Sequence, residues 1–226
     1  MTITLAFDVY GTLINTNGLV AKLQGFVGDI ATAFSQTWRD KQLEYSFRRG
    51  LMQNYRSFPV CTAQALDYSC AFYKVSLTEH QCRELLAEYR TLPAFDDVTS
   101  GISQLKREGF RLYAFSNGVE EDLESLLKGA GIRSLLDGVV SADPMRSFKP
   151  NPGVYSHFLR SAGTTGEAAW LISSNPFDVI GAVSAGMNSA WIQRSPEAVF
   201  DPWGIEPTLT VESLNILGAE IKRFYS

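Results

Sequence analysis

Short apolar runs alternate with amphipathic stretches over most of this sequence. The first run, Ile3–Phe7, is partly β-branched and ends abruptly at the charged Asp8. Similar runs follow at Arg111–Phe115, Gly138–Ser141, Ala168–Ile172 and Ser189–Gln193. All but the last pass directly into a polar loop. Short apolar runs that end in this way predict buried β-strands.

The stretches between these runs have the spacing of helices that bury one face. Val98, Ile102 and Leu105 share a helical face, and the apolar positions of Leu123–Ala130 share another. Strands that alternate with helices predict an α/β fold with a doubly wound parallel sheet. In such sheets ligands bind at the carboxyl ends of the strands. The polar loops that follow the runs are therefore the expected site.

The stretch between the first strand and the rest of the sheet has a different pattern. It contains helical runs such as Ala31–Tyr55 and Thr62–Lys74, and no convincing strand. Pro93 breaks the last helix, so Leu92–Phe95 is the expected hinge back to the sheet. This pattern predicts a helical cap inserted into a core domain. The predicted domains are a core of residues 1–15 and 91–226 and a cap of residues 16–90.

Composition allows a packed core and restricts the partners. Of the 226 residues, 45% are hydrophobic and 19% are charged, which is typical of a folded domain. The net charge is −4 and no long basic run occurs, so nucleic acid is not expected as a partner. A small anion remains possible, because the local field in a cleft decides its binding.

The sequence predicts a cytoplasmic protein with no membrane segment. No apolar stretch reaches the roughly 20 residues that span a bilayer, and the N-terminus lacks the signature of a secretory signal. Three cysteines are present, Cys61, Cys70 and Cys82, without a CxxC pair. Their odd number and spacing argue against a disulfide framework or a zinc site. They are expected to be small apolar residues of helices.

The most informative segment is Phe7–Leu13, with the sequence Phe-Asp-Val-Tyr-Gly-Thr-Leu. A carboxylate at the end of a buried strand, here Asp8, is well placed to act as a nucleophile. Gly11 would let backbone N–H groups approach a bound anion closely. The alternative for this segment alone is an aspartate that caps a helix in an ordinary strand-to-helix turn.

Four short motifs together resemble the haloacid dehalogenase superfamily over nearly the whole chain. The family pattern is Asp-x-Asp/Tyr-Gly-Thr-Leu, then a Ser or Thr at the end of the second strand, then a Lys, then an acidic segment. This sequence has Asp8, Ser116, Lys149 and Asp178 in that order. The resemblance implies a Rossmann-like core with an inserted cap. A non-catalytic protein on this fold is a rival hypothesis, but we would expect it to have lost one of these groups.

Two departures from the phosphatase pattern favour one branch of the superfamily. Superfamily phosphatases carry a second aspartate two positions after the nucleophile, where this chain has Tyr10. A tyrosine, with an unperturbed pKa of ~10, cannot replace that acid near neutral pH. The fourth motif, Ser173–Asp178, also lacks an acidic residue, whereas magnesium prefers carboxylate oxygens. A magnesium-dependent small-molecule phosphatase of the same superfamily is kept as the alternative.

The same departures resemble the type II 2-haloacid dehalogenases. Their signatures Asp-x-Tyr-Gly-Thr-Leu, Ser-Asn-Gly, Lys-Pro and Ser-Ser-Asn-x-x-Asp all occur here, and Trp38–Tyr45 resembles their cap segment with its arginine. The resemblance implies hydrolysis of short-chain (S)-2-haloacids to (R)-2-hydroxy acids and halide, through an ester on Asp8. It implies a small 2-haloacid as substrate, a homodimer, and neither a metal nor another cofactor.

The resemblance also assigns roles. Lys149 and Arg39 provide positive charge for the anionic substrate and the halide, and Asn175 and Asp178 position or activate the water. Leu43 and Phe58 form an apolar wall, and Ser173 and Tyr155 are partners of Lys149 and the carboxylates. The implied catalytic residues are Asp8, Thr12, Lys149, Ser173, Asn175 and Asp178. The residues implied around the substrate and halide are Tyr10, Arg39, Leu43, Phe58, Ser116, Asn117, Tyr155 and Phe177.

Overall fold

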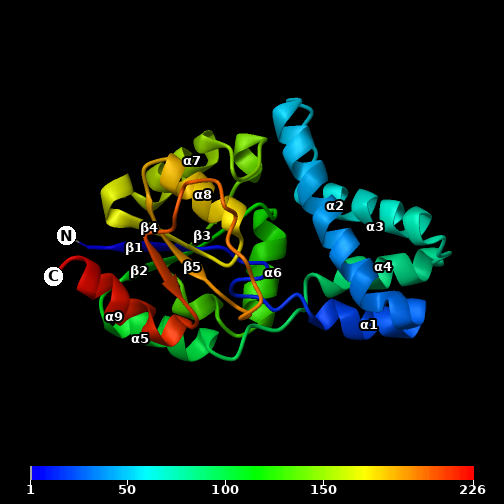
Figure 1. Ribbon diagram of the computed structural model, residues 1–226, viewed down its shortest axis with the longest axis horizontal. Helices are drawn as coiled ribbons and strands as arrows, with labels where there is room; N and C mark the ends of the chain where they lie inside the picture. Colours follow the sequence, from blue (N-terminus) through cyan, green and yellow to red (C-terminus); the bar gives the residue numbers. More distant parts are fainter. Residues whose placement is uncertain (1) are drawn as a thin grey trace.

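The strands form one six-stranded parallel sheet in the order β3-β2-β1-β4-β5-β6. The structure is a computed structural model that describes residues 2–226. The strands are β1 (Thr4–Phe7), β2 (Arg111–Ser116), β3 (Gly138–Ser141), β4 (Ala169–Ser173), β5 (Asn188–Ile192) and β6 (Leu209–Val211). The first strand thus lies in the middle of the sheet (Figure 1). The predicted doubly wound α/β fold is confirmed.

Helices cover both faces of the sheet, so the central strand is buried on both sides. Leu5 and Phe7 of β1 belong to one apolar cluster and Ala6 to the other, as the alternation of side chains along a strand requires. The first cluster includes α5 (Val98–Arg107), α6 (Glu120–Gly129) and α9 (Leu214–Phe224), and the second includes α7 (Pro152–Ala162) and α8 (Pro176–Ser184). Short 3-10 helices occur at Gly28–Ile30, Arg133–Leu135, Asp143–Met145 and Gly166–Ala168.

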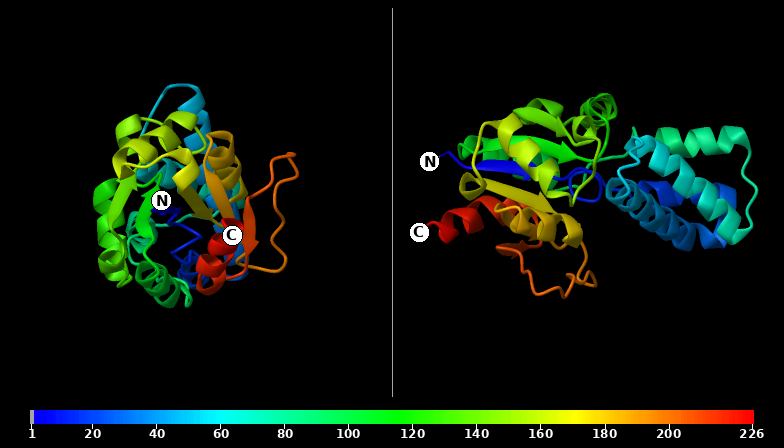
Figure 2. Two further views of the ribbon diagram at one scale, coloured as in Figure 1. Left: turned by 90° about the vertical axis from the view of Figure 1, so that its left-hand side faces the viewer. Right: turned by 90° about the horizontal axis from the view of Figure 1, so that it is seen from above.

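Four helices form a separate bundle beside the carboxyl ends of the strands (Figures 1 and 2). They are α1 (Gly18–Val27), α2 (Ala31–Leu51), α3 (Phe58–Tyr73) and α4 (Glu79–Glu88). The chain leaves and re-enters the core at neighbouring points. Ile14 and Ala94 pair there as an antiparallel bridge, and the Asn15 N–H donates to the Pro93 carbonyl at 2.8 Å. These two crossings form the hinge between the bundle and the sheet.

Some predicted elements differ from the observed ones. The predicted helical run to Tyr55 ends earlier, at Leu51, because Gln53 adopts a positive φ of 53° that a helix cannot contain. The last predicted strand is shifted by one residue, to Asn188–Ile192. The short strand β6 and helix α9 were not among the predicted elements. Only Val211 of β6 is buried, so this strand has no clear apolar pattern.

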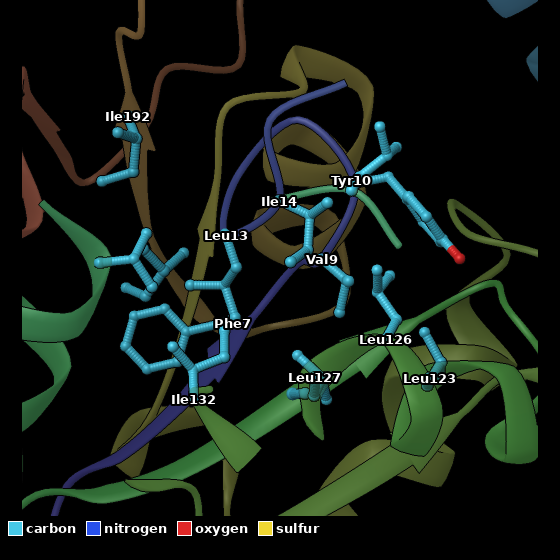
Figure 3. Close-up of a cluster of buried hydrophobic side chains, with 14 of the residues drawn as sticks. Phe7, Val9, Tyr10, Leu13, Ile14, Leu123, Leu126, Leu127, Ile132 and Ile192 are labelled. Atoms are coloured by element: carbon cyan, nitrogen blue, oxygen red, sulfur yellow. The ribbon is translucent and has the colours of Figure 1, made fainter. Parts of the chain in front are cut away.

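The loop after β1 is held in place by apolar side chains on both sides of Asp8. Phe7, Val9 and Leu13 are fully buried and belong to the same cluster as Leu123 and Leu126 of α6 (Figure 3). Because protein interiors are closely packed, this anchoring limits the movement of the loop. In residues 2–226, no helix is both long and apolar enough to cross a membrane.

The contact between α5 and α9 gives a test of packing. A Cβ at Gly101 of α5 would lie 2.6 Å from the Leu214 Cβ, so Gly101→Ala forces the helices apart. We expect it to lower the free energy of unfolding by ~1–3 kcal/mol, as other overpacked sites do. Gly25→Ala in α1 meets nothing within 4 Å and is expected to raise it by up to ~1 kcal/mol. Urea denaturation of both variants checks this. Equal effects in the two variants would contradict the packing described.

Candidate active site

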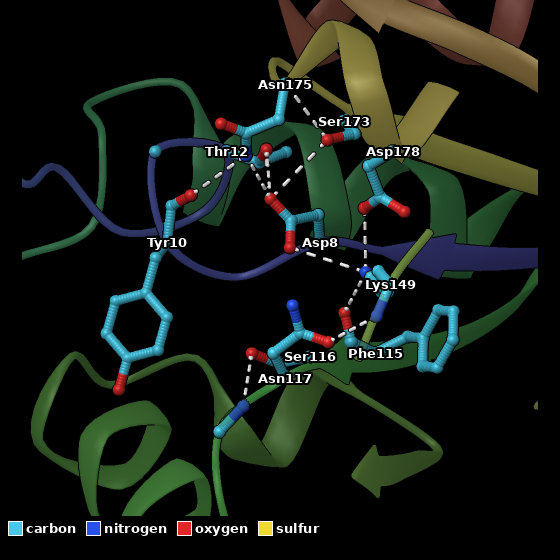
Figure 4. A network of polar contacts seen from close by, with 12 residues as sticks. Asp8, Tyr10, Thr12, Phe115, Ser116, Asn117, Lys149, Ser173, Asn175 and Asp178 are labelled. Atoms are coloured by element: carbon cyan, nitrogen blue, oxygen red, sulfur yellow. Dashed lines mark hydrogen bonds and ion pairs between the residues drawn. The ribbon is translucent and has the colours of Figure 1, made fainter. Parts of the chain in front are cut away.

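The carboxylate of Asp8 lies at the carboxyl end of β1, and only 8% of the residue is exposed. Its Oδ2 accepts hydrogen bonds from Thr12 Oγ1 at 3.1 Å, Ser173 Oγ at 3.4 Å and Asn175 Nδ2 at 2.7 Å (Figure 4). These donors are uncharged and come from the loops after β1 and β4. The three donors therefore fix Oδ2 of the carboxylate, and Oδ1 remains free of these bonds.

The other oxygen faces the ammonium group of Lys149. Lys149 Nζ lies 3.4 Å from Asp8 Oδ1, 2.7 Å from Asp178 Oδ2 and 2.8 Å from the carbonyl oxygen of Phe115. It also lies over the Phe115 ring, 4.1 Å from the centroid. The lysine side chain is only 1% exposed. A buried ammonium requires such partners, because an unpaired charge in the interior is very costly.

Asp178, in the first turn of α8, forms the far end of this charge cluster. Its Oδ1 accepts a hydrogen bond of 2.8 Å from the hydroxyl of Tyr155. Burial, the largest cause, and the negative charge of Asp8 raise the pKa of Asp178 to about 6, although Lys149 and the Tyr155 hydroxyl lower it. A carboxylate of this kind is largely ionised at neutral pH and still able to accept a proton.

Ser174 joins the two loops that surround Asp8. Its N–H donates to Thr12 Oγ1 at 2.9 Å, and its hydroxyl donates to the Gly11 carbonyl at 2.6 Å. With its lone pair engaged by this N–H, the Thr12 hydroxyl can direct its own proton to Asp8. Gly11 has a φ of 84°, which favours glycine. The amide of Asn175 also donates to the Tyr10 carbonyl at 3.2 Å.

Ser116, the last residue of β2, and Asn117, which follows it, present donors to the same space. The backbone N–H of Lys149 donates to Asn117 Oδ1 at 2.8 Å, which fixes the orientation of that amide. Its Nδ2 therefore lies on the opposite side and points toward Asp8 (Figure 4). Ser116 Oγ accepts the Gly118 N–H at 3.2 Å, so its hydroxyl proton is available.

The cap contributes aromatic rings and one guanidinium. The Tyr10 ring lies 6.2 Å from that of Phe58 and 6.0 Å from that of Tyr89, measured between centroids. Burial is the main cause that raises the pKa of Tyr10, and the nearby Arg39 guanidinium acts against it. Arg39 also donates to Gln42 Oε1 at 2.7 Å. Arg39 thus lies on the cap side of the Tyr10 ring, and no hydrogen bond joins it to Asp8.

Three other predicted residues occupy different surroundings. The Phe177 ring packs edge-on against Phe47 of α2, at a centroid distance of 5.0 Å, so it lies where core and cap meet. Leu43 is half-buried on α2. Tyr155 has no exposed surface and lies behind Asp178. Its hydroxyl is a hydrogen-bond partner of the buried Asp178 carboxylate, and a place for Tyr155 beside the substrate stays a prediction.

A cleft of about 370 Å³ adjoins the site on the side of Tyr10 and Gly118. Its other wall is formed by α3 and α4, with Phe58 and Tyr89 among the lining residues. At its edge the Arg90 guanidinium pairs with Asp122 at 3.0 Å, which connects cap to core. Sequence reasoning missed this pair because neither residue belongs to a motif.

The groups that surround Asp8 do not form a suitable set of ligands for a magnesium ion. The Tyr10 carbonyl already accepts the Asn175 amide, and the Lys149 ammonium lies between the carboxylates of Asp8 and Asp178. A divalent cation there would face that ammonium group. Within residues 2–226, no group of three or more His, Cys, Asp or Glu side chains is arranged to hold a metal.

Comparison with known proteins agrees with this geometry. The sequence matches the family of haloacid dehalogenase-like hydrolases over residues 4–186. An (S)-2-haloacid dehalogenase of Pseudomonas sp. (strain YL) is 33% identical over 210 residues, which cover 93% of this chain and 90% of the relative. Haloacetate dehalogenase H-2 of Moraxella sp. (strain B) is 34% identical over 213 residues, with 94% and 95% covered.

A solved structure is similar over the whole length. It is an L-2-haloacid dehalogenase from Xanthobacter autotrophicus with chloropropionic acid covalently bound, with a TM-score of 0.91 and 27% identity. The alignment covers 98% of this chain and 99% of that one. The fold, the buried aspartate and the sequence match define a hydrolase with a Rossmann-like core. The chain belongs to the haloacid dehalogenase-like hydrolases, and the relatives described above are 2-haloacid dehalogenases.

The bond from Tyr155 to Asp178 predicts a measurable change in protonation. Tyr155→Phe removes a donor that stabilises the ionised carboxylate, so the pKa of Asp178 should rise above about 6. We expect the pKa of Asp178 to rise by roughly one unit, since a hydrogen bond is worth ~1 kcal/mol and one pKa unit corresponds to ~1.4 kcal/mol. Carbon NMR of labelled aspartates follows this titration. Tyr113→Phe, which removes a hydroxyl bonded to Arg111, is the control and should leave Asp178 unchanged.

Proposed function

We propose that this protein hydrolyses short-chain (S)-2-haloacids to (R)-2-hydroxy acids and halide. The observation that carries the proposal is the asymmetry of the Asp8 carboxylate. Neutral donors hold Oδ2, whereas Oδ1 contacts the Lys149 ammonium at 3.4 Å and is the oxygen left to react. The similarity to 2-haloacid dehalogenases supports the same chemistry.

In the first step Asp8 Oδ1 attacks C2 of the substrate from the side opposite the halogen. The bond from C2 to Oδ1 forms as the carbon–halogen bond breaks, and the electron pair leaves with the halide. This displacement inverts C2 and produces an ester on Asp8. The donors on Oδ2 hold the carboxylate in one orientation, which favours such an attack because the reacting atoms are already positioned.

In the second step water attacks the carboxyl carbon of Asp8. Negative charge develops on Oδ2, where Thr12, Ser173 and Asn175 already donate, so they act as a preformed oxyanion hole. Asp178 accepts the proton of the water. The bond from the carboxyl carbon to Oδ1 breaks, and Oδ1 takes a proton from the Lys149 ammonium and leaves as the product hydroxyl. The proton that Asp178 accepted from water then passes to Lys149, which restores both charges. Configuration at C2 does not change again.

The substrate is held by donors from the core and by the cap. Ser116 Oγ and the backbone N–H of Asn117 bind the substrate carboxylate. Arg39 and the Asn117 amide receive the halide, with the edge of the Phe177 ring beside them. Tyr10, Leu43 and Phe58 form the apolar wall that excludes water. In this proposal residues 16–90 form the cap domain over a core of residues 1–15 and 91–226.

Phosphatase activity is not favoured. A phosphoryl-transfer site of this superfamily needs an acid at the position of Tyr10 and oxygen ligands for magnesium. Burial raises the pKa of Tyr10 further above its ordinary value, so this residue is an even poorer acid here. The ammonium group of Lys149, between the two carboxylates, would also repel a divalent cation bound to them.

Halide release from 2-chloropropionate tests the proposal. We expect release from the (S) enantiomer, little from the (R) enantiomer, and no effect of a chelator. Asp8→Ala should abolish release, a loss of at least ~10³-fold, because no nucleophile remains. Asp40→Ala, at an exposed position of α2, should retain activity. Magnesium-dependent phosphate release without halide release would overturn the proposal.

A single turnover in water enriched with heavy oxygen tests the ester. The solvent oxygen should enter the Asp8 carboxylate, because the water attacks its carboxyl carbon. Mass spectrometry of the peptide that contains Asp8 detects the added mass. Label found only in the hydroxy acid would instead mean that water attacks C2 directly.

We further propose that the protein is a homodimer that works in the cytoplasm. Leu51 at the end of α2 and Phe72 of α3 are 86% and 60% exposed, so both helices carry apolar side chains that a partner subunit could cover. The cysteines are free thiols, which suits a reducing compartment. Light scattering of the purified chain should give twice the mass of 25.0 kDa. A single 25.0 kDa species at micromolar concentration would refute the dimer.

A further inference from the structure

Arg194 lies in the loop after β5. Its side chain extends to the loop after β1, residues Asp8–Thr12, which is called the nucleophile loop below. Its side chain is 14% exposed. One terminal nitrogen donates to Asp97 Oδ1 at 2.7 Å, and the other donates to the backbone carbonyl of Thr12, also at 2.7 Å. The guanidinium lies over the Phe95 ring, 4.3 Å from its centroid. One arginine therefore contacts both segments that cross between core and cap.

The bond to Thr12 is directly relevant to Asp8. Thr12 has no exposed surface, and in the described part of the chain Arg194 is the donor found for its carbonyl. The hydroxyl of the same residue donates to Asp8 Oδ2 at 3.1 Å. Arg194 thus holds the backbone of Thr12, and the Ser174 N–H holds the hydroxyl of the same residue.

The other partner of Arg194 is itself fixed in the core. Asp97 Oδ2 accepts the Leu214 N–H at 2.8 Å and the Ser213 hydroxyl at 3.0 Å. Burial raises the pKa of Asp97, but the bond from Leu214 and the charge of Arg194 outweigh it, so the net pKa is lowered. Asp97, just before α5, is therefore a charged group fixed by its bonds to the start of α9. Arg194 links this fixed carboxylate to the Asp8–Thr12 loop.

We propose that Arg194 is a positioning residue for the reaction, which holds the Thr12 backbone so that Asp8 Oδ1 stays aligned for attack. It touches neither Asp8 nor the groups assigned to the substrate, so it acts on the chemical step and not on substrate binding. The inference rests on the proposed dehalogenation. A guanidinium suits the role because its rigid fork reaches two acceptors at once.

Two substitutions test the proposal. Arg194→Gln removes the charge and both long-range contacts, and Arg194→Lys keeps the charge but loses the planar fork whose two nitrogens donate to Asp97 and Thr12. We expect kcat on (S)-2-chloropropionate to fall about ten- to a hundredfold for the glutamine variant, since a displacement of ~1 Å in a reacting group can cost that much. The lysine variant should fall less, and KM should stay within about twofold for both.

Arg133 provides a matched control. Its Nε pairs with Glu124 Oε1 at 2.8 Å and its terminal nitrogen donates to the Leu136 carbonyl at 3.1 Å, so it also joins a carboxylate to a backbone carbonyl. It lies between α6 and β3 and contacts no residue of the nucleophile loop. Arg133→Gln should destabilise the fold to a similar degree and leave kcat unchanged.

Circular dichroism gives the fraction of folded molecules in each variant, and each kcat is calculated per folded molecule. A wild-type kcat in folded Arg194→Gln, or an equal loss of kcat in Arg133→Gln, would overturn the inference. If the glutamine variant does not fold, Arg194→Lys decides: an unchanged kcat overturns the proposal and a fall of about threefold or more at constant KM supports it. Absence of halide release in the wild type is a different result, which would overturn the proposed function instead.

Discussion

The buried ion cluster of Asp8, Lys149 and Asp178 is the interaction on which the rest of the structure depends. An ammonium group with 1% exposure is stable only because two carboxylates, the Phe115 carbonyl and an aromatic face surround it. These groups come from β1, the end of β2, the loop before α7, and α8. The sheet order, with β1 between β2 and β4, is what brings them to one point. Replacing Lys149 would leave two buried carboxylates without their cation, so fold and site constrain each other.

The same cluster links the two proposed steps through its net charge. In the free enzyme, two carboxylates and one ammonium carry a net charge of −1. When Asp8 becomes an ester its charge is lost, and the remaining pair of Lys149 and Asp178 is neutral. Because the charge of Asp8 contributes to the raised pKa of Asp178, esterification makes Asp178 easier to ionise just before it must accept a proton. For the proposed anionic substrate, the net negative charge of the free site makes a further cation necessary, and Arg39 is the residue proposed to supply it.

Much of the fold and the centre of the site could be predicted because both depend on local signals. Asp8 follows a buried strand directly, so strand order brings it near the other strand ends, and Lys149 was found through the family motif. Other features depend on contacts that leave no local pattern. Val211 is the only buried residue of a three-residue strand, too short for an apolar period. Arg194 lies outside every motif, and its role becomes visible only when its two acceptors are seen together.

The central position of β1 has a consequence for how the chain folds. Thr4 pairs with Arg111 on one side and Ala169 on the other, so the first strand to be synthesised can enter the sheet only after much of the chain exists. Closing such long loops is entropically unfavourable and slows folding. The cap helices, by contrast, pack with near neighbours in sequence and can form during synthesis. The strand that leads into Asp8 is therefore completed late, so the buried contacts of this carboxylate form only after β2 and β4 are present.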